Sequence, residues 1–71
     1  MTEFHIRNKV VDEEEFRKQL KLLKALCRSK LKMSIFEDQS KGIVVQHWFC
    51  KDIGSLWVVA DDYDELKVLG L

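Results

Sequence analysis

Apolar residues recur at helical spacing in the first half of the chain and at every second position in the second half. Four of them fall at i, i+4, i+7 and i+11 and so share one face of a helix: Phe16, Leu20, Leu23 and Cys27. Asp12 stands where a helix N-cap is expected, and Glu15 completes an imperfect capping box. The pattern predicts one long amphipathic helix over residues 12–30.

Alternation of apolar and polar residues predicts four short strands. They cover residues 2–6, 33–37, 43–50 and 55–60, and polar connections separate the last three. From Asp61 the chain places acids in a first turn and Gly70 just past the last apolar position, which is typical of a short helix. The predicted fold is a small single α+β domain, residues 1–71, in the order β-α-β-β-β-α. Its antiparallel sheet is covered on one face by the long helix.

The strand at residues 43–50 is apolar on both of its faces. The set predicted to face the helix is Ile43, Val45 and Phe49. That choice puts Trp48 on the outer face, while Trp57 lies in the neighbouring strand. Two alternatives stay open for the tryptophans: they are core residues, or they are apolar anchors for a partner.

Charge is unevenly distributed, although twelve acidic and twelve basic residues cancel. Between Phe16 and Lys32 lie seven basic residues and no acidic one. Four of these line one helix face beside the apolar stripe and are called the basic ridge: Arg17, Lys21, Lys24 and Arg28. Zero net charge argues against general electrostatic binding to DNA or to a membrane. The asymmetry instead suits docking to a protein with an acidic surface, or to a second copy in a homodimer.

The candidate chemistry is sparse. Cys27 and Cys50 lack the spacing of a redox or zinc motif, and Cys27 is predicted to be a buried free thiol. A Cys27–Cys50 disulfide is the less favoured alternative, because it needs the helix to cross the end of the strand and no secretory signal is visible. His47 and Cys50 point to opposite strand faces, which argues against a nucleophile–base pair. The chain is therefore predicted to be no enzyme, to bind no cofactor or metal, and to be cytoplasmic.

The sequence favours a small non-catalytic protein-binding module that acts as a regulator, inhibitor or adaptor. Its predicted contact residues are the basic ridge with Trp48 and Trp57. The alternative is a nucleic-acid-binding module that uses the same basic helix face. A metal- or thiol-dependent enzyme using His47 and Cys50 ranks behind both.

Overall fold

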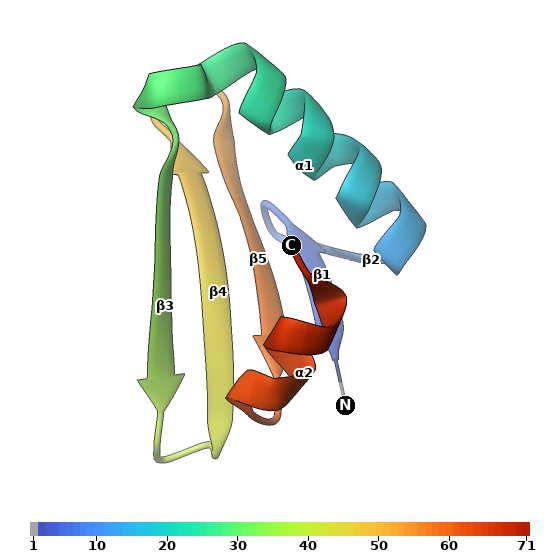
Figure 1. Cartoon of the computed structure of the whole chain (residues 1–71), viewed down its shortest axis with the longest axis vertical. Helices are drawn as coiled ribbons and strands as arrows, with labels where there is room; N and C mark the ends of the chain where they lie inside the picture. Colours follow the sequence, from blue (N-terminus) through green and yellow to red (C-terminus); the bar gives the residue numbers. More distant parts are fainter. Residues whose placement is uncertain (1) are drawn as a thin grey trace.

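In the computed structural model, which describes residues 2–71, five antiparallel strands form one sheet (Figure 1). The elements are β1 (Glu3–Ile6), β2 (Lys9–Val11), α1 (Glu13–Cys27), the 3₁₀ turn η1 (Arg28–Lys30), β3 (Lys32–Asp38), β4 (Ile43–Cys50), β5 (Gly54–Ala60) and α2 (Tyr63–Leu69). The order across the sheet is β2-β1-β5-β4-β3. The predicted α+β class is confirmed, and β2 is an additional strand that the sequence analysis missed.

Helix α1 begins and ends at residues that satisfy its terminal backbone groups. The Asp12 carboxylate accepts a hydrogen bond from the Glu15 amide at 2.8 Å, which confirms the predicted N-cap. At the other end the Arg28 amide donates to the Lys24 carbonyl, and Arg28 has a φ of 47°. Because this backbone conformation cannot continue an α-helix, α1 stops at Cys27 and the chain continues as η1. The predicted helical stretch to residue 30 is therefore confirmed, with its last three residues in the tighter 3₁₀ turn η1.

The apolar stripe of α1 packs on the sheet and forms the core. Phe16 is fully buried, and its ring centroid lies 5.3 Å from that of Phe4 and 5.9 Å from that of Trp48. Val58, near the middle of β5, is also fully buried. The core thus lies between α1 and the side chains that β1, β4 and β5 direct towards it.

The face of strand β4 that packs against the helices is not the predicted one. Four buried residues alternate along it on the helix side: Val44, Gln46, Trp48 and Cys50. The register with β5 places Trp48 opposite Leu56, which belongs to the core. Because residues that pair across a sheet share a face, the predicted inward position of Ile43, Val45 and Phe49 is wrong.

Helix α2 lies on the same side of the sheet as α1, where it contacts β5 (Figure 1). It begins at Asp62, whose carboxylate accepts a hydrogen bond from the Glu65 amide at 3.0 Å. It ends at Gly70, which has a φ of 65° and caps the last turn. The predicted short helix is thereby confirmed, and its buried Leu66 completes the core.

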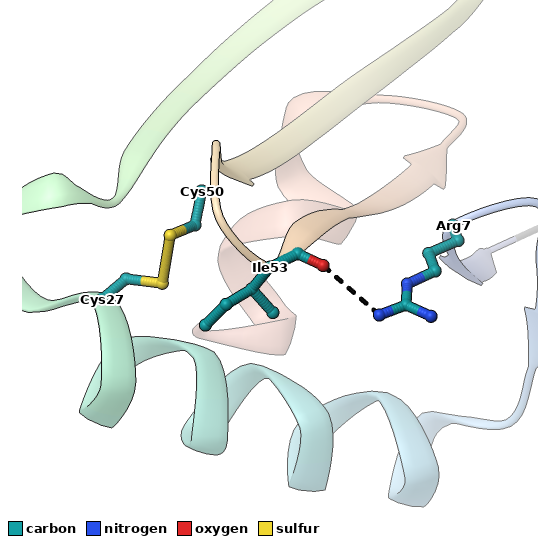
Figure 2. The surroundings of a disulfide bond; sticks show 4 residues. All are labelled: Arg7, Cys27, Cys50 and Ile53. Atoms are coloured by element: carbon teal, nitrogen blue, oxygen red, sulfur yellow. Dashed lines mark hydrogen bonds between the residues drawn. A yellow bond between two sulfur atoms is a disulfide. The ribbon is translucent and has the colours of Figure 1, made fainter.

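A disulfide joins Cys27, the last residue of α1, to Cys50, the last residue of β4 (Figure 2). Both residues are buried, and their Cα atoms are 6.5 Å apart. The prediction of a free Cys27 thiol is wrong, because the helix does cross the end of the strand. Cys50 then faces the helix side and meets the apolar stripe of α1.

Candidate functional site

The sheet face away from the helices, here called the open face, carries a row of rings. His5, Trp57 and His47 lie opposite one another on β1, β5 and β4. The His5 ring stacks on Trp57 with centroids 5.1 Å apart, and His47 meets Trp57 edge-on at 6.2 Å. Phe49 extends this ring row, because its centroid is 6.2 Å from that of His47. Sheet register therefore assembles four rings that are dispersed in the sequence.

Apolar side chains continue the ring row across the open face. Phe36 is 51% exposed and Phe49 is 40% exposed. A shallow hollow of about 370 Å³ lies on this face, and its apolar lining consists of Phe36, Ile43, Val45, Trp57 and Val59. Val45 is buried at this hollow, and the exposed rings of Phe36 and Phe49 are the apolar groups of the face that a partner could cover.

Charged residues of both signs border the open face. The register places Glu3 opposite Val59 and Lys32 opposite Phe49, so both charged residues share this face. Asp38 and Lys41 line the hollow where β3 ends. The Ser40 hydroxyl donates a hydrogen bond to Asp38 at 2.6 Å and holds the pKa of that carboxyl below its usual value. The apolar centre is therefore bordered by two acids and two bases.

The basic ridge lies on the helix side and divides into three environments. The Arg17 guanidinium donates to Glu13 at 2.8 Å and to the Leu69 carbonyl at 2.7 Å, so it ties α1 to the end of α2. Lys21 and Lys24 are exposed beside a shallow groove that the C-terminal residues also line. Arg28 lies in η1, beyond the end of α1. The exposed ridge cations are thus tied to α2 at Arg17, placed beside the C-terminal groove at Lys21 and Lys24, and located in the 3₁₀ turn at Arg28.

The structure does not bring the predicted contact residues together. Trp48 is 3% exposed and packs edge-on against Phe16, so it is a core residue. Trp57 belongs to the ring row, on the opposite side of the sheet from Lys21 and Lys24. One flat partner surface cannot contact both the ridge and Trp57.

A second hollow, of about 450 Å³, separates α1 from the β1–β2 hairpin and the β4–β5 turn. Three exposed apolar residues line it: Leu22, Leu26 and Ile53. Arg7 also lines this hollow and donates a hydrogen bond to the Ile53 carbonyl at 3.3 Å, near the disulfide (Figure 2). The sequence analysis missed this groove. The spacing of Leu22 and Leu26 at i and i+4 beside the apolar stripe was a signal for it.

The groups considered for catalysis or metal binding are separated. Cys50 is committed to the disulfide on the helix side, while His47 lies on the open face. The Trp57 indole stands between His47 and His5. Within residues 2–71, no group of three or more histidine, cysteine, aspartate or glutamate side chains is placed to hold a metal ion.

No helix among residues 2–71 has both the length and the apolar character that crossing a bilayer requires. Comparison with known protein families, with curated proteins and with solved structures finds no match to this chain.

Proposed function

We propose that the chain is a small non-catalytic protein-binding module, a regulator, inhibitor or adaptor, whose contact surface is the open face. The ring row, together with the exposed Phe36 on the same face, is the observation that carries this proposal. A domain of this size has few large apolar side chains to build a core. Aromatic residues held outside that core, on an ordered sheet, are well suited to bury against another molecule.

The partner that fits the open face is a protein that presents apolar side chains. An apolar centre with charges at its border is the usual anatomy of a protein–protein interface. A nucleic acid would instead require a positively charged groove beside the stacking rings. Here Glu3 and Asp38 offset Lys32 and Lys41, which favours the protein partner. Trp57, at the centre of the ring row, is the proposed anchor.

Paired variants on the two sides of the sheet test this proposal. Phe49→Ser and Trp57→Ala alter the open face, whereas Leu26→Ser and Val68→Ser alter apolar residues of the helices that are 70% and 87% exposed. Binding to a partner purified from the native host is measured by isothermal titration calorimetry, and circular dichroism verifies folding. The open-face variants are expected to weaken binding at least about tenfold, and the helix variants to leave it unchanged.

The opposite pattern, in which only the helix variants weaken binding, would refute the open face as the contact surface. Salt-sensitive binding to single-stranded or duplex nucleic acid in a mobility-shift titration, with loss in Trp57→Ala, would replace the protein partner by a nucleic acid. NMR chemical-shift changes on partner addition provide an independent map. They are expected at His5, His47 and Phe49.

Lys21 and Lys24 have a separate proposed role, which is to steer an acidic partner before contact. Exposed charges outside an interface change association rates more than affinity. The double variant Lys21→Glu/Lys24→Glu is therefore expected to slow association and to flatten its salt dependence while the fold stays intact. Lys18→Glu/Lys30→Glu makes the same charge change at exposed positions off the ridge and is the matched control. Equal association kinetics in the two double variants would refute the steering role of Lys21 and Lys24.

The disulfide indicates the kind of cellular compartment in which the protein is found. Structural disulfides form and persist in oxidising compartments and are rare in the cytosol. The Cys27–Cys50 bond therefore argues against the cytoplasmic location expected from the sequence. That location stays a prediction. Alkylation of thiols in native cell extracts, followed by mass spectrometry, determines which state the chain adopts in its own compartment.

A further inference from the structure

The two edges of the sheet differ in how well they are protected from pairing with another strand. β2, at one edge, has only three residues and begins with Lys9. β3, at the other edge, has seven residues, and its sequence KMSIFED contains neither proline nor glycine. Its charges stand only at the two ends. Natural edge strands are usually short, bulged, interrupted by proline or charged, because an unpaired strand is a template for another chain. The uncharged middle of β3, residues 33–36, lacks these protections.

β3 also exposes apolar side chains on both faces of the sheet. Met33 and Ile35 lie on the helix side, opposite Trp48 and Gln46, and are 52% and 44% exposed. Phe36 lies on the open face. In Figure 1, β3 runs along the side of the sheet away from β2, and no helix lies over its middle. The edge thus offers unpaired backbone together with apolar contacts above and below it.

We infer that β3 pairs in antiparallel fashion with β3 of a second copy of this chain, which makes a continuous ten-stranded sheet. An alignment that pairs all seven residues has its two-fold axis at Ile35, because this residue is the middle of the strand. Lys32 then lies opposite Asp38 of the second copy, and Asp38 lies opposite its Lys32. Two pairs of opposite charge therefore flank the pairing of Ile35 with its own copy.

This self-complementarity identifies the second copy as the occupant of the edge. A strand from an unrelated protein would need an acid and a base at the same spacing, whereas the sequence of β3 supplies both to itself. A two-fold axis perpendicular to the sheet keeps both open faces on one side. The inference goes beyond the proposed function, because it concerns the edge strand and not the ring row centred on Trp57.

Charge reversal tests the register directly. In a homodimer of Lys32→Glu, each pair of residues 32 and 38 joins two acids. In a homodimer of Asp38→Lys, each pair joins two bases. Each variant alone is therefore expected to weaken dimerisation about tenfold. An equimolar mixture of the two variants restores both opposite-charge pairs in a heterodimer. The double variant restores them in a homodimer. Sedimentation velocity over a concentration series measures the dissociation constants, and Lys9→Glu, at the other edge, is the matched control.

Asp38 also accepts the hydrogen bond from Ser40, so circular dichroism must show that Asp38→Lys is folded. A second measurement does not depend on that substitution. In Ile35→Cys the new thiols of the two copies would lie at directly opposed positions, where strand spacing suits a disulfide. Mild oxidation is expected to cross-link Ile35→Cys rapidly, and Val68→Cys, on the exposed side of α2, only slowly.

Three results would overturn the inference. The first is a wild-type chain that stays monomeric at millimolar concentration. The second is a dimer whose dissociation constant is the same in wild type and in Lys32→Glu. The third is a mixture of folded Lys32→Glu and Asp38→Lys chains that associates no better than either variant alone. None of these results bears on whether Trp57 and Phe49 bind a partner, so the two proposals fail separately.

Discussion

Reduction of the Cys27–Cys50 disulfide is expected to lower the free energy of unfolding substantially. The bond joins residues 23 apart in the sequence, and the chain-entropy relation for a loop of this size gives a contribution of about 3 kcal/mol. A domain of 71 residues is ordinarily stable by roughly 4 to 10 kcal/mol. Reduction is therefore expected to remove between a third and most of the total.

Urea denaturation followed by tryptophan fluorescence measures this loss. Buried Trp48 reports the core, and the reduced protein is prepared by unfolding and refolding under a phosphine reductant. With a urea dependence of about 1 kcal/mol per molar, the midpoint is expected to fall by about 3 M on reduction. Cys27→Ala/Cys50→Ala is the control. It keeps small apolar side chains at two buried positions and is expected to unfold near the reduced midpoint, with or without reductant.

Two outcomes would contradict this reasoning. Equal midpoints for the oxidised and reduced chains would show that the cross-link does not constrain the unfolded state. Labelling of two thiols in the unfolded, unreduced protein would show that the bond is absent. A lower midpoint in Cys27→Ala/Cys50→Ala than in the reduced wild-type protein would instead measure the packing of the cysteine side chains.

Two further predictions concern the chain outside the disulfide. Arg28→Gly is expected to raise the free energy of unfolding by about 1 kcal/mol, because Arg28 has φ 47° and ψ −118°, a region that favours glycine. Urea denaturation measures this change, and a similar gain in Arg28→Ala would contradict the backbone explanation. Ser40→Ala is expected to raise the pKa of Asp38, since the hydroxyl that stabilises its carboxylate is lost. The stabilisation from that hydrogen bond is present above the usual carboxyl pKa and disappears as the pH falls through the lowered pKa. An NMR titration of the carboxyl carbon measures the shift, and an unchanged pKa would refute the role of Ser40.

The helices were predictable because their signals are local. Asp12 and Asp62 cap helices whose apolar spacing is regular, and Gly70 marks the end of α2. β2 had no comparable signal, since three residues are too few to show a period. Its pairing with β1 also depends on Arg7, which adopts a φ of 58° in the connecting turn, where glycine or asparagine is the usual residue. A turn made by an atypical residue is invisible to sequence patterns.

The faces of the sheet depended on information that no single strand contains. β4 has apolar residues on both sides, and only its register with β5 and the position of Cys27 determine which side is buried. The spatial relation between the basic ridge and Trp57 is likewise tertiary. Sequence spacing made Lys21, Lys24 and Trp57 candidate contact residues. It could not show that the lysines and the tryptophan lie on opposite sides of the molecule.

β4 is a strand whose alignment is weakly specified by its own composition. A one-residue slip would direct Ile43, Val45 and Phe49 towards α1 and would still bury mostly apolar surface. Cys50, however, meets Cys27 only when the observed side of β4 lies beneath the helix. The covalent bond is therefore compatible only with the observed facing of β4, and it holds the strand on that side once it has formed.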